Sequence, residues 1–248
     1  MMFYWIILGQ IILNPYNFSP PVSNTLNNGL IYYYGMEETG TRFDGEPTGT
    51  PQDLTDNNTV AQGAGKKGFA AQWQPGVVEY LSHPDSPDLS IGDIDLTWTF
   101  WVYPTSSDAN YNIITQGTDI SDDLCAYRIY MPTDTAVRFR LSNGSTHGDV
   151  TTPSGSVPIN TFTYVRVEHD AAANTISIEL NNSGTVTTTS YSGGGFDSTA
   201  QFCIGYLQGS SGFSGLIDEV KFWKRKLTTQ EQADDYGGGT PPFCCPIP

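Results

Sequence analysis

The sequence predicts an all-β protein, an antiparallel sandwich of two β-sheets with one short helix near the C-terminal end. One observation is composition: Gly, Thr, Ser and Asn are frequent, Lys and Arg together number only 11, and aromatic residues reach 12%. Such a composition is typical of strands and turns. A second observation is a series of short β-prone runs separated by turn residues. Because 248 residues suit a single sandwich, we predict one core and no second globular domain.

The predicted strands begin after Gly29 and follow one another along the chain. The runs are 30–34, 69–73, 77–81, 95–103, 112–115, 124–130, 136–141, 162–169, 175–180, 186–189 and 201–206. Pro75-Gly76 and Asn143-Gly144 are turn signals between such runs. In the run 95–103, hydrophobic and aromatic side chains alternate onto both faces, so we expect both faces to be partly covered.

The segment 215–236, GLIDEVKFWKRKLTTQEQADDY, predicts the last strand and the helix. Strict alternation over 216–223 would place Asp218 with Val220 and Phe222 on one face, and Glu219 with Lys221 on the other. Thr228 and Glu231 have the spacing of a capping box, in which each side chain bonds to the other's backbone amide. The glycines 237–239 and Pro241 then end the helix.

The organisation predicted is an apolar arm and linker over 1–28, a jelly-roll-sized domain over 29–236 and a Gly/Pro/Cys tail over 237–248. The stretch 1–13, MMFYWIILGQIIL, precedes any basic residue, since the first is Arg42, and it is too short to span a bilayer. We interpret it as an arm that packs on another subunit in an oligomer or larger assembly. The alternatives are an uncleaved export signal and a wrongly assigned start codon.

Charge and cysteine spacing exclude some partners. The net charge is -15 and the pI is near 4.2, so nucleic acid would be repelled. The four cysteines have no zinc-ligand spacing; Cys125 and Cys203 lie in strand-like runs and are expected to be buried, whereas Cys244-Cys245 could form a disulfide.

Four segments together resemble the laminin-G-like branch of the concanavalin A-like lectin/glucanase superfamily. They are GLIYYYGMEETG, GKKGFAAQWQPGVVEYLSHPDSPDLSIGDIDLTWTFWVYP, TFTYVRVEHDAAANTISIELNNSG and GLIDEVKFWKRKLTTQEQ. In the third segment, Phe162 stands where the family usually has Trp. The resemblance covers about 29–236 and implies a concanavalin A-like jelly roll.

Enzymatic activity is not predicted. Glucanases of this superfamily carry their two carboxylates as Glu-x-Asp-x-x-Glu on one strand, and no such string occurs here. Glu37 and Glu38 are adjacent and would point to opposite faces of a strand. The three histidines are isolated, without a nucleophile setting.

The resemblance implies one structural Ca²⁺ between the opening acidic segment and the closing strand. The matching positions are Glu37 or Glu38, Asp44 and Asp218. The loop at Asp44 departs from the family's usual Asp-x-Ser-Gly-Asn-Gly. The alternative is that Asp218 caps backbone amides while the other carboxylates are solvated.

For sugar binding, exposed aromatic side chains would be needed for stacking. Trp101, Tyr103 and Tyr111 are the candidates, and packing in the core is the alternative for each of them. Two functions remain open. One is a structural subunit displayed on a large assembly, such as a virion decoration, a fibre or another surface protein; the other is an extracellular carbohydrate-binding module, with or without calcium. Both predict a location outside the cell or on a virion surface.

Overall fold

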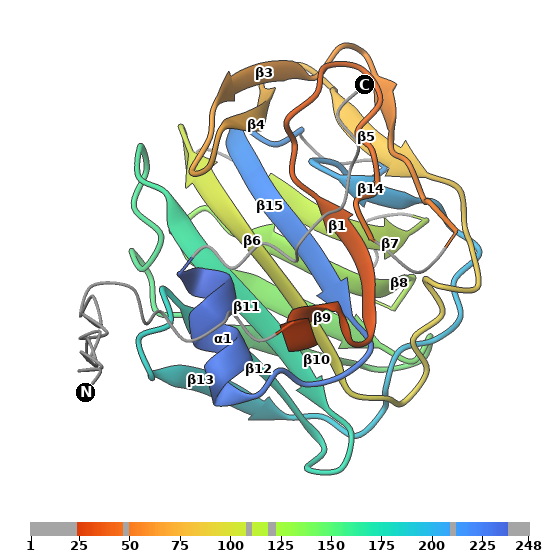
Figure 1. Cartoon of the computed structure of the whole chain (residues 1–248). Helices are drawn as coiled ribbons and strands as arrows, with labels where there is room; N and C mark the ends of the chain where they lie inside the picture. Colours follow the sequence, from red (N-terminus) through yellow and green to blue (C-terminus); the bar gives the residue numbers. More distant parts are fainter. Residues whose placement is uncertain (1–23, 47–49, 108–110, 119–122, 209–211, 238–248) are drawn as a thin grey trace, which may run out of the picture.

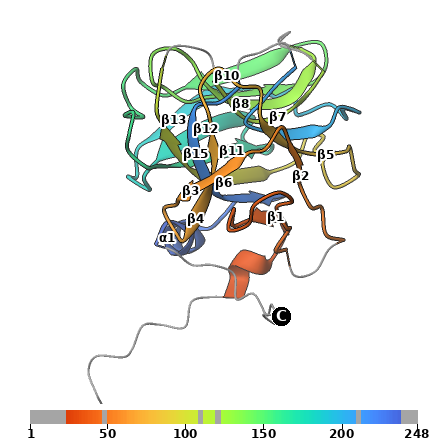
Figure 2. The same cartoon turned by 90° about the horizontal axis from the view of Figure 1, so that it is seen from above.

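Two antiparallel sheets stack face to face in the computed structural model of the chain (Figures 1 and 2). The structure describes residues 24–46, 50–107, 111–118, 123–208 and 212–237. One short helix lies on the outer side of one sheet (Figure 1). The predicted two-sheet sandwich is therefore confirmed. The predicted arm at 1–13 and the cysteine pair of the tail lie outside the described residues.

The first sheet has eight strands and carries the helix. In spatial order they are β13 (Val186–Ser190), β12 (Thr175–Leu180), β11 (Thr163–Asp170), β6 (Leu96–Pro104), β15 (Gly215–Trp223), β4 (Phe69–Trp73) and β3 (Ala61–Ala64). The eighth strand, β1 (Leu30–Tyr34), pairs with the second half of β15, while β4 pairs with the first half. The closing strand β15 therefore joins the opening strand to the middle of the sheet.

The second sheet has seven strands. Their spatial order is β10 (His147–Thr151), β9 (Arg138–Ser142), β8 (Cys125–Met131), β7 (Tyr111–Gly117), β14 (Phe202–Ile204), β5 (Tyr80–His83) and β2 (Thr55–Asn57). The run predicted over 77–81 is displaced, because Val77 and Val78 are exposed before β5 begins. The strands β2, β3 and β10 were not predicted; their sequences, TDN, AQGA and HGDVT, contain few of the β-branched or aromatic residues that mark strands.

The core between the sheets is aromatic at its centre. Trp98 of β6 stacks on Phe222 of β15 with ring centroids 4.1 Å apart and on Phe202 of β14 at 5.6 Å. These rings join strands of both sheets, so the three side chains fix the spacing of the sandwich. All three are fully buried. Nearly every residue of β6 is buried, which confirms the expectation that both of its faces are covered.

The closing strand departs from strict alternation. Its register against β6 shifts between Asp218 and Lys221, and Glu219 has a φ of 53°. This is a β-bulge, which adds one residue to a strand and turns the following side chains to the other face. Val220 and Phe222 face the core, while Asp218 and Lys221 both lie on the outer side. The prediction that Asp218 shares a face with Val220 was therefore wrong.

The helix α1 (Thr229–Tyr236) begins with the predicted capping box of Thr228 and Glu231. A short 3-10 helix, η1 (Asn24–Asn27), lies near it and buries Leu26 against Trp223, whose indole Nε1 donates to the Leu26 carbonyl at 2.7 Å. The folded unit therefore begins within the stretch predicted as linker, at least as early as Asn24. The described part of the chain contains no helix that is long and apolar enough to cross a membrane.

Candidate functional site

The three carboxylates of the predicted calcium site each cap backbone amides. Asp44 accepts from the amides of Tyr33 and Glu46 through Oδ1, and from the amide of Gln52 through Oδ2. Glu37 accepts from the Phe69 amide, and Asp218 accepts from the Lys67 amide at 3.0 Å. Glu37 and Asp218 thus hold the same turn between β3 and β4, whereas Asp44 organises its own loop.

Asp218 lies beside a buried network of opposite charges. Lys67 Nζ contacts Glu219 at 2.9 Å, and Lys221 Nζ contacts Glu219 at 3.1 Å and Asp235 of α1 at 2.8 Å. Tyr33 donates its hydroxyl to Glu219. Two ammonium groups therefore already balance the charges of Glu219 and Asp235, where a metal ion would otherwise be the source of positive charge.

These residues do not fit the implied ligand set. Calcium needs six to eight oxygen ligands converging on one point. Among the residues that the structure describes, no three His, Cys, Asp or Glu side chains form a group that could hold a metal ion. Glu37, Asp44 and Asp218 are instead used in backbone capping, which is the alternative that the sequence left open for Asp218.

From this geometry we expect Ca²⁺ to leave the melting temperature unchanged. A ligand that binds only the folded state raises stability by RT ln(1 + [L]/Kd), so a structural Ca²⁺ at millimolar concentration would be visible. Differential scanning fluorimetry in 5 mM CaCl₂ and in 5 mM EGTA is the measurement, with MgCl₂ as the control for ionic strength. A calcium-specific rise of several degrees would restore the implied site.

The three predicted sugar-binding aromatics do not lie together. Trp101 and Tyr103 lie on the outer face of the eight-stranded sheet, where Trp101 is buried between Tyr236 and the Lys66 ammonium group. Tyr103 is half-buried and packs on Phe162 at 5.0 Å. Tyr111 belongs to the core and contacts Phe213 edge to face. Among the three, only Tyr103 presents a partly exposed ring.

The outer face of the seven-stranded sheet gathers polar side chains in register. Along each strand they alternate with core residues such as Leu81, Ile129 and Phe139, so they point away from the core. We call this surface the polar face. Its in-register row runs from β10 to β2 through Asp149, Arg140, Arg128, Thr115, Cys203, Ser82 and Thr55. In this row Asp149 is half-buried and Thr55 is exposed, whereas the other five side chains are buried.

Arginines dominate one half of the polar face. Three of the six arginines in the sequence, Arg128, Arg138 and Arg140, lie on the neighbouring strands β8 and β9. Arg140 makes a bidentate pair with Asp149 of β10, with both distances 2.6 Å. The Arg128 guanidinium lies 4.0 Å from the ring centre of Tyr130. This half of the face therefore brings three guanidinium groups together, one of which is paired with Asp149.

The other half of the polar face carries an aromatic pair. Tyr80 of β5 and Tyr206, just after β14, stack with ring centroids 4.9 Å apart and an interplanar angle of 23°. Both rings are half-buried. Between this pair and the arginines lie the small side chains of Thr115, Cys203 and Ser82. Burial raises the pKa of the Cys203 thiol to about 12, so this buried thiol is neutral.

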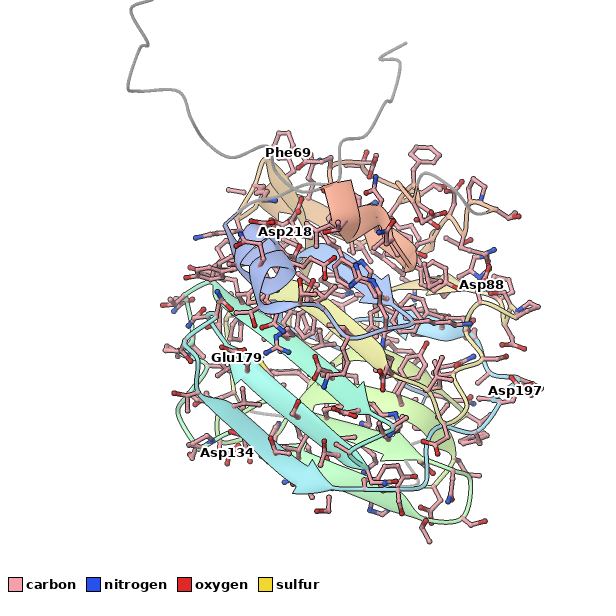
Figure 3. All side chains as sticks on the ribbon, turned by 60° about the horizontal axis from the view of Figure 1, so that its bottom comes forward. Phe69, Asp88, Asp134, Glu179, Asp197 and Asp218 are labelled. Carbon is pink, nitrogen blue, oxygen red and sulfur yellow. The ribbon has the colours of Figure 1, made fainter. Side chains whose placement is uncertain are left out.

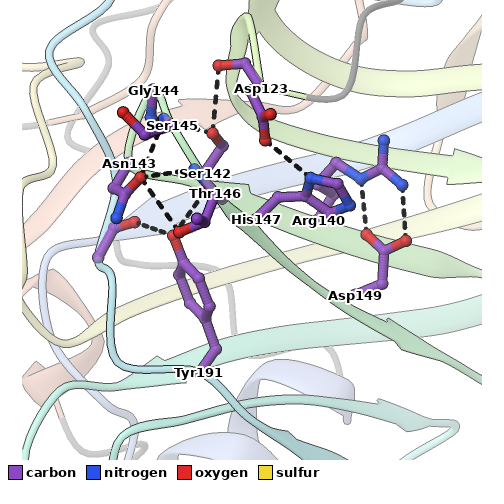
Figure 4. Close-up of polar contacts among 11 residues, drawn as sticks. Asp123, Arg140, Ser142, Asn143, Gly144, Ser145, Thr146, His147, Asp149 and Tyr191 are labelled. Carbon is purple, nitrogen blue, oxygen red and sulfur yellow. Dashed lines mark hydrogen bonds and ion pairs between the residues drawn. The ribbon is translucent and has the colours of Figure 1, made fainter.

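The β9–β10 end of the face is held by a rigid turn (Figure 4). The Asn143 side chain accepts from the amides of Ser145 and Thr146, and Gly144 supplies the left-handed conformation at φ 85°. This confirms the turn predicted at Asn143-Gly144. Beside it, His147 Nδ1 lies 2.8 Å from the Asp123 carboxylate. The turn fixes the register that places Arg140 opposite Asp149.

The polar face was not among the sites predicted from the sequence. A signal was present, because Arg128-Ile129-Tyr130 and Arg138-Phe139-Arg140 each place two polar or basic residues on one face of a strand. Tyr206 carried no comparable signal. Its position beside Tyr80 depends on the pairing of β14 with β5, which are far apart in the sequence.

Comparison with protein families identifies the fold. The family model described as concanavalin A-like lectin/glucanases superfamily matches residues 75–231. The chain therefore belongs to this superfamily. The predicted laminin-G-like resemblance is confirmed, and the observed two-sheet sandwich is the jelly roll that it implied. No curated protein sequence matches the chain at a significant level.

Several solved structures share the superfamily jelly roll. The binding domain of Paraclostridial Mosquitocidal Protein 1 is 14% identical with a TM-score of 0.65; the match covers 85% of this chain and 52% of that one. The botulinum neurotoxin serotype C1 binding domain is 12% identical with a TM-score of 0.65, with coverages of 87% and 53%.

A third structure matches over nearly its whole length. Domain 4 of AbnA, a GH43 extracellular arabinanase from Geobacillus stearothermophilus, was solved in complex with arabinotriose. It is 17% identical with a TM-score of 0.57, and the match covers 83% of this chain and 97% of that domain. This chain thus spans about half the length of the toxin binding domains but corresponds to the whole arabinanase domain. At these identities the likeness shows the fold alone.

Proposed function

We propose that this superfamily member is a non-enzymatic glycan-binding domain that acts outside the cell. The observation that carries the proposal is the polar face, where the stacked Tyr80–Tyr206 pair lies across a row of small polar residues from three arginines. Aromatic rings stack on the apolar faces of sugars, while fixed polar side chains bind sugar hydroxyls. The partly exposed Arg138 offers donors to such hydroxyls, and the carboxylate of Asp149, held by two bonds from Arg140, offers remaining lone pairs as acceptors.

The ligands of the similar structures agree with a binding role. Cell entry of botulinum neurotoxin type C depends upon interaction with two ganglioside molecules, another neurotoxin binding domain was solved with rat synaptotagmin II, and the arabinanase domain holds arabinotriose. The absence of the glucanase carboxylate string from the sequence supports a role without catalysis.

A glycan array with the full-length protein tests the proposal, followed by titration of the best-bound oligosaccharide. We expect Y206A and Y80A each to weaken binding about tenfold or more, because each removes a stacking ring. The matched control is Y103A, which removes a half-buried tyrosine from the opposite sheet. Melting temperatures of all three variants establish that they are folded.

The three variants show which of the two sheet faces carries the binding site. Loss of binding in Y103A, with Y206A and Y80A unaffected, would move the site to the residues that the sequence predicted. An array without any bound glycan would overturn the proposed function.

A second candidate is a subunit displayed on a large assembly, such as a virion or fibre, joined through the arm at 1–13. The apolar sequence MMFYWIILGQIIL supports it, since an apolar segment attached to an acidic domain needs a covering partner. Size-exclusion chromatography of the full chain beside a form lacking 1–23 tests this candidate. Two identical monomers would exclude it.

A further inference from the structure

The polar face contains a group of hydrogen-bond donors around one guanidinium. Arg138 of β9 donates from Nε to the Thr151 hydroxyl at 2.8 Å and from Nη1 to the Tyr130 hydroxyl at 3.0 Å. Both hydroxyl oxygens thereby act as acceptors, and each keeps its own proton for donation. Within the described residues, neither hydroxyl donates to a protein group, and Nη2 of Arg138 has no hydrogen-bond partner.

The unused capacity at this position is mostly of donors. Arg138 Nη2 has two N–H donors, and Tyr130 and Thr151 have one O–H donor each; the unused acceptors among these three side chains are the remaining lone pairs of the two hydroxyls. A carboxylate offers two oxygens that accept up to four hydrogen bonds, and it matches the flat edge of a guanidinium. A neutral sugar hydroxyl would use this group of donors only in part.

Local charge favours an anion at the same place. The Arg138 side chain is 34% exposed and can be reached from solvent. Its own nearest carboxylate, Asp149, lies 3.9 Å from Nη1 and is engaged in the bidentate pair with Arg140. The Arg138 guanidinium also lies 5.5 Å from the centre of the Tyr130 ring, so the ring limits the directions in which its head group can move. The donors are thus held in position before a ligand arrives.

We propose that Arg138, with the hydroxyls of Tyr130 and Thr151, binds the carboxylate of an acidic sugar. This inference rests on the proposed glycan-binding function and names the class of glycan. The overall charge of -15 restricts the ligand further. Because a long polyanion is repelled by the rest of the surface, the preferred ligand is a short oligosaccharide that carries one or a few carboxylates.

Matched pairs of oligosaccharides test the inference with the full chain. The probes are sialyllactose with lactose, cellobiouronic acid with cellobiose, and trigalacturonic acid with its methyl ester, each measured by isothermal titration. We expect the acidic member of at least one pair to bind about tenfold or more tightly than its neutral partner. R138Q should abolish that preference, R138K should retain part of it because the charge remains, and Y130F should weaken it several-fold.

The control for charge is K224Q, which also removes one positive charge but lies directly after β15 of the other sheet. It should retain the preference of the unchanged protein. Equal binding of acidic and neutral partners, or a preference that survives in R138Q, would overturn the inference while leaving the glycan-binding function intact. Binding to none of these probes together with an empty glycan array would overturn both.

Discussion

Replacing Lys221 with Met is expected to lower the free energy of unfolding by about 3–5 kcal/mol, because it removes one partner from a buried ion network. Lys221 is 2% exposed, and its ammonium group contacts Glu219 of the bulge and Asp235 of α1. Burial alone would lower the pKa of Lys221, but the two carboxylates raise it above its ordinary value, so the residue is charged. K221M would leave the buried carboxylates of Glu219 and Asp235 with less positive charge to balance their negative charges.

Urea denaturation followed by tryptophan fluorescence at pH 7 measures this effect. The matched control is K226M, because Lys226 is an exposed lysine that pairs with Asp170 and lies 3.7 Å from Glu168. Exposed pairs contribute about 0–1 kcal/mol, so K226M should unfold nearly as the unchanged protein does. If K221M and K226M lowered the free energy of unfolding by equal amounts, burial of the network would not be what stabilises the closing helix.

The closing segment illustrates what local sequence can predict. The helix start was predicted because Thr228 and Glu231 interact across three residues, and a capping box is a local device. The same holds for the Asn143-Gly144 turn. Strand runs such as 95–103 were recognised because burial on both faces requires almost every residue to be apolar or small.

The bulge at Glu219 was not predictable from alternation. Its φ of 53° is a conformation that non-glycine residues seldom adopt, and tertiary contacts compensate for its cost. Glu219 is held by Tyr33, Lys67 and Lys221, which come from three different strands or turns. An inference from one strand at a time cannot include those contacts.

The candidate site was missed for a related reason. The resemblance directed attention to Asp44 and Asp218, whose carboxylates cap loops here. The polar face instead depends on the register of seven strands, in which β14 lies between β7 and β5. Its two ends, the arginines of β8 and β9 and the tyrosines at β5 and β14, are adjacent only after that register is set. Residue type alone therefore could not locate it.

The second large effect concerns Asp218. This side chain is fully buried, and its Oδ1 atom has no hydrogen-bond partner among the described residues. Burial raises the pKa of Asp218 to about 7; the charge of Glu219 raises it as well, while the amides of Lys66, Lys67 and Glu219 act in the opposite direction. The folded protein thus holds a proton on Asp218 that the unfolded chain releases near its ordinary pKa of 3.8.

The sign of the pH dependence follows from that difference. Because the folded state binds the proton more tightly, the contribution of Asp218 to stability is greatest below about pH 4, declines as the pH rises toward 7 and is level above it. Over this pH range the contribution of Asp218 to the free energy of unfolding falls by an amount on the order of 4 kcal/mol. D218N carries no charge at any pH, and its side-chain oxygen can still accept from the Lys67 amide.

We therefore expect D218N to be more stable than the unchanged protein by a few kcal/mol at pH 8 and nearly equal to it at pH 4. Urea denaturation of both proteins at pH 4, 6 and 8 measures the difference, and subtracting the two curves removes the contribution of every other titrating group. D134N is the control, since Asp134 is exposed and lies at the far end of the molecule from Asp218 (Figure 3). If D218N instead destabilised the protein more at pH 8 than at pH 4, the ionised carboxylate would have a stabilising partner, and a bound cation would be the first candidate to measure.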